Sequence, residues 1–112
     1  MGQTKRVRGS SSGRPIMALL DLLSRRWTLR VIWELRAGPL TFRALRAAAD
    51  NLSPTVLQTR LGDLREARLV ALSEGGYALT ALGRELFDSF QPLNDFAKRW
   101  SEAGGGPEDA EA

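Results

Sequence analysis

The sequence predicts a mainly α-helical (α+β) protein with one small β-hairpin: a winged helix-turn-helix with terminal dimerisation helices. Three features of residues 38–79 predict the winged helix-turn-helix itself: a Gly-Pro stop, two short amphipathic helices joined by a tight turn, and a hairpin with a glycine-rich tip. Paired short helices are common in all-α proteins, but a pair followed at once by a two-stranded hairpin is far more specific. We therefore expect one winged-helix domain.

The chain divides into three segments. Residues 1–13 are predicted to be a flexible basic arm, 14–103 the winged-helix domain with its dimerisation helices, and 104–112 a disordered acidic tail. At 112 residues, with 43% hydrophobic and 26% charged residues, the composition is that of an ordinary globular domain. So small a core gives modest stability, and a partner subunit would add to it.

Two helices are expected before the Gly38-Pro39 stop. Pro15 suits a first helical position, and leucines at three- and four-residue spacing indicate a helix over 15–23, ended by Ser24. The segment 27–36 is apolar over more than half its circumference, so we expect a helix buried on two sides.

The next two helices form the predicted helix-turn-helix. Thr41 can cap a short helix over 42–48, and a turn follows at 50–52. Ser53 and Pro54 are a favourable cap and first residue for a helix over 54–67, whose apolar stripe is Leu57, Leu61 and Leu64.

A β-hairpin and a last helical region complete the domain. Residues 69–73 and 77–79 read as short strands around the tip 74–76. Thr80 can cap the last helical region, which Pro92 should bend or break. An apolar face then continues to about Ala103, too extensive to leave exposed in so small a domain.

The outer face of the 54–67 helix is poor in large apolar residues. Thr55, Gln58 and Thr59 lie on it. Gln can bind adenine bidentately, Thr methyls can pack on thymine, and hydroxyls reach phosphates or base edges. An ordinary solvated helix face would look similar, but its place as the second helix before a wing favours DNA contact.

Positive charge gathers on two regions. Residues 1–14 carry four basic residues and no acid, and 25–68 carry nine arginines against four acids, whereas 69–103 carry three basic and five acidic residues. This distribution fits binding to a polyanion. The alternative is an arginine-rich protein whose surface arginines are simply solvated.

Histidine and cysteine are both absent. Imidazole bases, thiol nucleophiles, disulfides and nearly all zinc sites are thereby excluded, and no phosphate-binding loop is recognisable. We therefore expect neither enzymatic activity nor a cofactor or metal. No apolar run is long enough to span a bilayer or act as a signal peptide, so a cytoplasmic location is expected.

The tryptophans allow two interpretations. Trp27, Trp33 and Trp100 could line a ligand pocket, because indoles give broad apolar walls. Tryptophan at helical spacing is more often core or interface, so we assign Trp27 and Trp33 to the core and Trp100, with Phe96, to an interface.

Several motifs across residues 14–102 together resemble the HxlR branch of the MarR-like bacterial transcription regulators. They are Arg26-Trp27-Thr28, the element from Gly38-Pro39 to Phe42 and Leu45, the Ser53, Leu57, Arg60, Leu61, Leu64 pattern followed by Leu69-Val70, and Tyr77-Ala78-Leu79-Thr80 with Gly83. Two departures matter. The family's Cys-Pro pair is here Arg14-Pro15, which rules out thiol sensing, and the wing is short with no positive charge at its tip.

The resemblance implies a homodimer, joined through its terminal helices, that binds double-stranded DNA at an inverted repeat and regulates transcription, most simply as a repressor. Whether a small-molecule effector is sensed is left open. The alternative is a winged-helix module that binds protein. Expected DNA contacts are Thr41, Arg43, Arg46, Ser53, Thr55, Gln58, Thr59, Arg60 and Arg65. Expected interface residues are Leu19, Leu20, Phe90, Leu93, Phe96 and Trp100.

Overall fold

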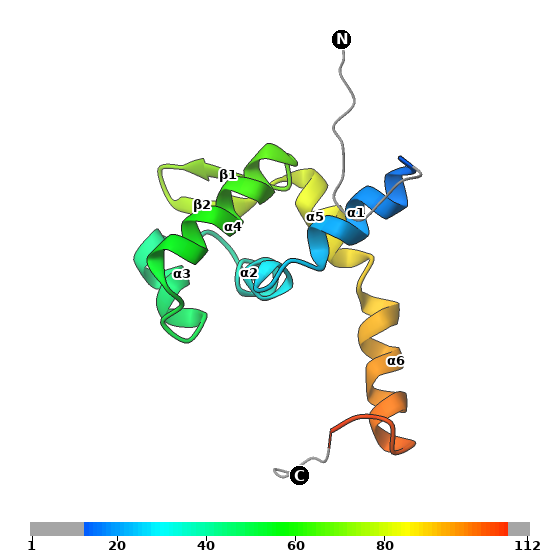
Figure 1. The fold of residues 1–112 in the computed structure, drawn as a ribbon. Coiled ribbons are helices and arrows are strands. Elements are labelled where there is room, and N and C mark those ends of the chain that lie inside the picture. The colour runs from blue at the N-terminus through cyan, green and yellow to red at the C-terminus, as the bar shows by residue number, and fades with distance from the viewer. Residues whose placement is uncertain (1–12, 108–112) are drawn as a thin grey trace.

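The computed structural model describes residues 13–107. The predicted basic arm therefore lies almost wholly outside the described residues, as does most of the predicted acidic tail. In chain order the elements are α1 (Pro15–Leu23), α2 (Thr28–Glu34), α3 (Phe42–Ala48), α4 (Pro54–Glu66), β1 (Val70–Ser73), β2 (Gly76–Leu79), α5 (Ala81–Asp88) and α6 (Gln91–Glu102). Figure 1 shows α2, α3, α4 and the hairpin gathered on one side, with α1, α5 and α6 on the other. The predicted mainly helical fold with one antiparallel hairpin, a winged helix-turn-helix, is confirmed.

Side-chain caps fix where the two helices of the helix-turn-helix begin. The Thr41 hydroxyl accepts a hydrogen bond from the Ala44 N–H at 3.1 Å, and the Ser53 hydroxyl accepts one from the Val56 N–H at 3.3 Å. Each satisfies a backbone donor that the first helical turn would leave unpaired. Both helices thus start where the sequence predicts.

The turn between α3 and α4 contains two residues in the left-handed backbone conformation and is held by hydrogen bonds from two arginines. Asp50 and Asn51 have φ of 59° and 58°, a conformation that Asn and Asp tolerate better than most residues. Arg46 Nε donates to the Leu52 carbonyl oxygen at 2.6 Å. Arg30 of α2 contacts Asp50 and the Ala48 carbonyl, so α2 also holds the turn.

The core lies between α2, α3, α4 and the start of the hairpin. Its members are all buried: Val31, Ile32, Leu35, Leu45, Ala49, Leu52, Leu57, Leu61, Leu64, Leu69, Val70 and Tyr77. The predicted leucine stripe of α4 supplies three of them, so burial of that stripe fixes which side of α4 faces solvent.

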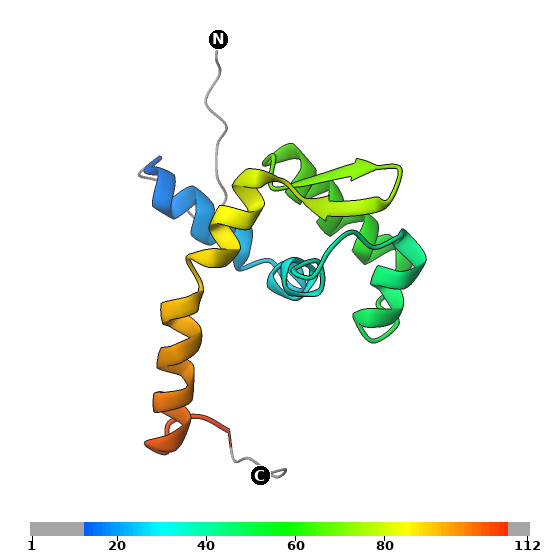
Figure 2. The ribbon, with the colours of Figure 1, turned by 180° about the vertical axis from the view of Figure 1, so that it is seen from behind.

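The hairpin is antiparallel, with Val70 opposite Leu79 and Ser73 opposite Gly76. Leu40 pairs with Tyr77 through two backbone hydrogen bonds of 2.8 and 2.9 Å, which ties the α2–α3 connection to β2. Gly76 is required there, because its φ is 114° and a Cβ would lie 2.4 Å from the Leu40 carbonyl oxygen. The wing is thus tied near its tip, at the start of β2, to the segment that leads into α3 (Figure 2).

The C-terminal region consists of two helices, and the boundary between them lies slightly before Pro92, where the sequence predicts a bend or break. α5 ends at Asp88, and Pro92 lies in the first turn of α6, where its missing N–H costs nothing. Figures 1 and 2 both show α6 projecting away from the rest of the domain, and every residue from 91 to 102 is exposed. No core contact therefore explains the apolar side chains of this helix.

One expectation about α2 is wrong. The helix begins only at Thr28, after Trp27 with φ of 74°, and it is not buried on both sides. Trp27 is half-buried against the core, but Trp33 and Leu29 are 45% and 47% exposed. Trp33 instead packs beside Phe87 of α5, and the Arg36 guanidinium covers its ring at 3.8 Å.

Candidate nucleic-acid interface

The outer face of α4 carries the three side chains expected to read bases. Thr55, Gln58 and Thr59 are all exposed, on the side of the helix opposite the buried leucine stripe. The Thr59 hydroxyl donates to the Thr55 carbonyl at 3.0 Å, which fixes this hydroxyl while leaving its lone pairs free to accept. The face therefore offers the Thr59 hydroxyl as an ordered hydrogen-bond acceptor, with the exposed side-chain amide of Gln58 beside it.

The basic side chains expected to contact DNA on α3 and α4 differ in exposure. Arg43 of α3 is exposed, and Arg65 follows Gln58 by two helical turns along α4 and is also exposed. Arg46 is half-buried, because its Nε is bound to the Leu52 carbonyl. Arg43 and Arg65 are thus free to reach outward, whereas Arg46 also holds the turn.

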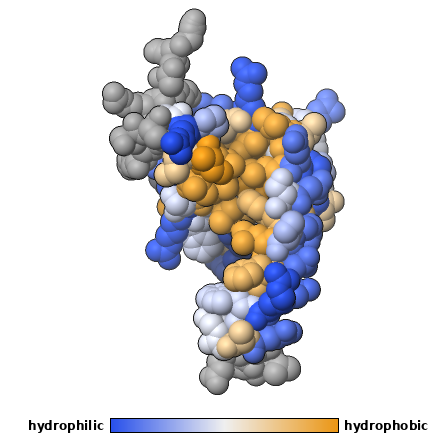
Figure 3. All heavy atoms as spheres, turned by 90° about the vertical axis from the view of Figure 1, so that its right-hand side faces the viewer, coloured by the Kyte–Doolittle hydropathy of each residue, from blue (hydrophilic) through white to orange (hydrophobic). Residues whose placement is uncertain are grey.

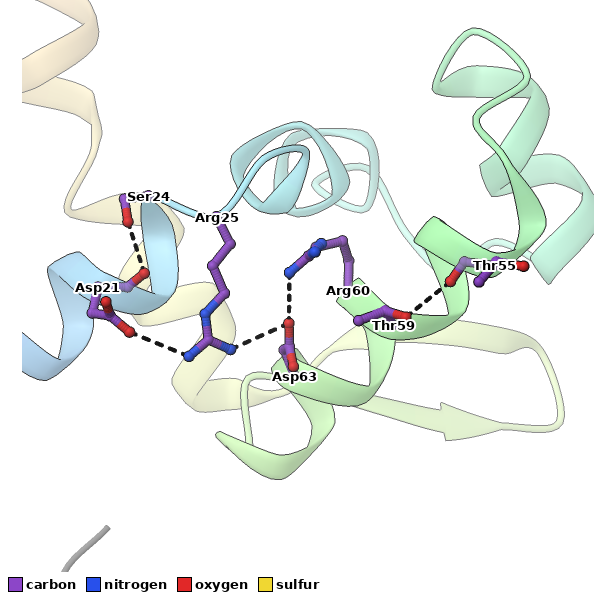
Figure 4. A network of polar contacts seen from close by, with 7 residues as sticks. All are labelled: Asp21, Ser24, Arg25, Thr55, Thr59, Arg60 and Asp63. Atoms are coloured by element: carbon purple, nitrogen blue, oxygen red, sulfur yellow. Dashed lines mark hydrogen bonds and ion pairs between the residues drawn. The ribbon is translucent and has the colours of Figure 1, made fainter. Parts of the chain in front are cut away.

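Arg60 lies apart from the other expected DNA contacts. Its side chain is 21% exposed, its Nη1 donates to Asp63 Oδ2 at 2.9 Å, and its Nε is buried without a hydrogen-bond partner. Figure 4 shows it directed toward Asp63 and the linker before α2, not toward Thr55 and Thr59. Arg60 is therefore placed to hold α4 on the domain.

Sequence reasoning missed Arg25, which stands between α1 and α4. Partial burial lowers the pKa of its guanidinium, but hydrogen bonds to Asp21 and Asp63 and the charges of both carboxylates outweigh that and leave the pKa raised. The i, i+4 spacing of Asp21 and Arg25 could have indicated the first pair. No sequence signal indicates the second, because Asp63 lies 38 positions further along the chain.

A second surface, on α1, α5 and α6, is apolar. Figure 3 views this side of the molecule and shows an apolar patch framed by hydrophilic side chains. A groove of about 910 Å³ runs between α1, α2, α5 and α6. Of the expected interface residues, Leu19 and Phe90 are half-buried and the others are 47–62% exposed: Leu20, Leu93, Phe96 and Trp100. Leu29 and Trp33 extend this surface onto α2.

Among residues 13–107, no group of three or more acidic, His or Cys side chains is placed to hold a metal ion. Across the same residues, every helix is too short or too polar to cross a membrane.

Comparison with known families decides the identity of the fold. A family model for the HxlR-like helix-turn-helix matches residues 22–104. The chain belongs to the HxlR-like helix-turn-helix family. It is a DNA-binding transcription regulator of the winged helix-turn-helix type, and the matched segment contains every residue of the candidate interface.

Two curated relatives and one solved structure are consistent with this. The chain is 31% identical over 88 residues to the uncharacterized HTH-type transcriptional regulator YvaP of Bacillus subtilis, covering 72% of this chain and 82% of that one. It is 23% identical over 91 residues to the uncharacterized HTH-type transcriptional regulator MJ0925 of Methanocaldococcus jannaschii, covering 78% and 86%. Quinone-bound YodB from B. subtilis superposes with a TM-score of 0.71 at 27% identity, covering 75% of this chain and 96% of YodB.

Proposed function

We propose that this protein regulates transcription in the cytoplasm as a homodimer bound to an inverted-repeat operator, most simply as a repressor. One observation carries the proposal: α4 presents small hydrogen-bonding side chains outward while its leucine stripe is buried and its N-terminus is fixed by the Ser53 cap. A helix so held can enter a major groove with a defined face toward the bases.

Base reading is assigned to Thr55, Gln58 and Thr59. Gln58 carries both a donor and an acceptor on one amide, which suits the adenine edge in the major groove. Thr59 has its proton engaged with the Thr55 carbonyl, so it would accept a hydrogen bond from an exocyclic amino group of adenine or cytosine.

Phosphate contact is assigned to the helix starts and the flanking arginines. The capping hydroxyls of Thr41 and Ser53 accept bonds from their own helices, and each retains one O–H that can donate to a phosphate oxygen. Arg43, Arg46 and Arg65 would supply the positive charge that neutralises the backbone. Arg60 would act indirectly, by holding α4.

Dimerisation is assigned to the apolar surface of α1 and α6. An α6 that leaves Leu93, Phe96 and Trp100 about half exposed is unfavourable in water and would be stabilised by a second copy. A twofold dimer presents two recognition helices related by symmetry, which requires half-sites about one helical turn apart, or a multiple of it.

The chain contains no cysteine, so any effector would have to bind without forming a thiol adduct or disulfide. YodB has been solved with quinone bound and after diamide treatment, the latter superposing with a TM-score of 0.62. Should this protein respond to small molecules, we propose that it does so by non-covalent binding.

A second candidate function is a winged-helix module that binds protein. It is favoured by the wing, whose tip carries Glu74 and no basic residue. The exposed arginines around α3 and α4 argue against it, because they would repel one another unless a polyanion neutralised them.

Titration of random duplex DNA at increasing salt separates the two functions. Arg43, Arg46 and Arg65 on two protomers would make six phosphate contacts, which contribute about −5 to the slope of log K against log salt, and the basic arm would make the slope steeper. A protein-binding module predicts no measurable affinity for DNA or a slope near zero. The matched control is the double variant Arg43→Gln/Arg65→Gln, which keeps the Arg46 bond to the Leu52 carbonyl and should have a clearly shallower slope.

A further inference from the structure

A chain of ion pairs links α1 to the recognition helix α4. Arg25, in the linker that follows α1, places Nη2 3.2 Å from Asp21 Oδ2 and Nη1 3.3 Å from Asp63 Oδ2. The same Asp63 oxygen accepts the hydrogen bond from Arg60. Figure 4 shows the four side chains in one continuous row from α1 to α4. A single guanidinium thus joins a carboxylate on each of two helices.

These ion pairs matter because packing holds α1 only weakly. None of its residues is buried, and Leu22 and Leu23 are only partly buried against the core. The side chains of Asp21 and Asp63 are 18% and 21% exposed and that of Arg25 is 38% exposed, so solvent screens these pairs in part, although less than it screens a pair at the open surface. The planar, two-pronged guanidinium also constrains direction as well as distance.

We propose that Arg25 is a positioning residue. Bound to Asp21 and Asp63, it fixes the orientation of α4 relative to α1 and so sets the spacing between half-sites that the dimer can bind. The inference rests on the proposed function, in which α1 contributes to the dimer surface and α4 reads DNA. We assign Arg25 no contact of its own with the bases or the partner subunit. Its effect is geometric, because the two recognition helices are rigidly spaced only if each is rigidly joined to the interface.

The test is a panel of inverted repeats whose spacer changes by one base pair at a time. Each step shifts one half-site by about 3.4 Å and rotates it by about a tenth of a turn, so a rigid dimer discriminates sharply. We expect the full chain to prefer its best spacer over the neighbouring ones by about fivefold or more, and Arg25→Gln to reduce that preference to less than about twofold. Affinity for an isolated half-site should not change.

Arg26→Gln is the matched control. It removes the same charge one residue further along the same linker, from an exposed side chain that stacks near Trp27. A loss of net charge or a general loss of stability would weaken binding to all spacers in proportion and leave the preference intact. Should Arg25→Gln not fold, Asp21→Asn removes only the α1 end of the bridge and should flatten the profile in the same way.

Pulsed electron paramagnetic resonance gives a second readout that needs no DNA. Because the chain has no cysteine, Gln58→Cys carries one spin label per protomer, and the dimer reports the separation of its recognition helices. Arg25→Gln should broaden that distance distribution, and Arg26→Gln should not. An unchanged spacer profile in a folded Arg25→Gln protein would overturn the inference, whereas wild-type protein that prefers no inverted repeat would remove the proposed function itself.

Discussion

Trp100 on α6 gives a prediction whose size can be estimated from its exposure. Its indole is 47% exposed in the single chain, and a fully buried tryptophan covers about 250 Å². A dimer that buried all of this exposed area would remove about 120 Å² of apolar surface per protomer, which corresponds to about 3 kcal/mol at 25 cal/mol per Å². Because a dimer contains two Trp100 side chains, full burial would contribute at most twice this free energy. Burial of only half of the exposed area would contribute about 3 kcal/mol per dimer. Trp100→Ala should therefore raise the dimer dissociation constant by about a hundredfold.

Sedimentation across a concentration series measures this change, with circular dichroism to show that the helices remain. Lys98→Ala is the matched control, because Lys98 lies on the opposite face of the same exposed helix and its loss should leave the dimer intact. A folded Phe96→Ala/Trp100→Ala variant that stays fully dimeric at micromolar concentration would exclude α6 as the main dimer interface. The interface would then lie elsewhere, most plausibly on α1 around Leu19 and Leu20.

Three further predictions follow from the α4 face, two glycines and the arm. Gln58→Ala should weaken binding to the selected operator by about 1–3 kcal/mol and relax preference at one base position, with little change on random DNA; equal losses on both would make Gln58 a phosphate contact. Gly83→Ala should lower the free energy of unfolding by about 3 kcal/mol, because the added Cβ would lie 2.1 Å from the Leu69 carbonyl oxygen. Gly62→Ala, with open space around it, should raise the free energy of unfolding by about 1 kcal/mol, and thermal melts that rank the two variants the other way would contradict this packing. Deleting residues 1–13 should make the salt dependence of DNA binding shallower without unfolding the domain, and an unchanged slope would exclude the arm from binding.

Local sequence signals predicted the parts of the fold that local interactions determine. Thr41, Ser53 and Thr80 each accept a hydrogen bond from a backbone N–H in the first turn of their helices, as predicted from residue type and position. Gly76 lies in the hairpin as expected, because both its backbone conformation and its close approach to Leu40 exclude a side chain.

Periodicity could not show which apolar faces lack a partner within the chain. Trp33 fits a buried helix by its spacing, yet α5 reaches only one side of it, and its other side remains open to solvent. The same pattern serves core and interface alike, because both require an apolar stripe.

Long-range ion pairs were also beyond sequence reasoning. Arg60 was expected to face DNA, although it follows Leu57 by three residues and precedes Leu64 by four, which places it beside the buried stripe. The i, i+3 spacing of Arg60 and Asp63 is compatible with an ion pair within α4, but the approach of Arg25 to Asp63 depends on how α1 packs near α4. The positions of these charges therefore emerge only from the tertiary structure.

Selection of bound sequences from a random duplex library shows whether this protein binds DNA as a twofold dimer. We expect the full chain to enrich an inverted repeat whose half-sites lie about ten base pairs apart, or a multiple of that spacing, because a twofold dimer places one α4 in each of two major grooves. Enrichment of a single, non-repeated site, or no enrichment over the starting library, would contradict it.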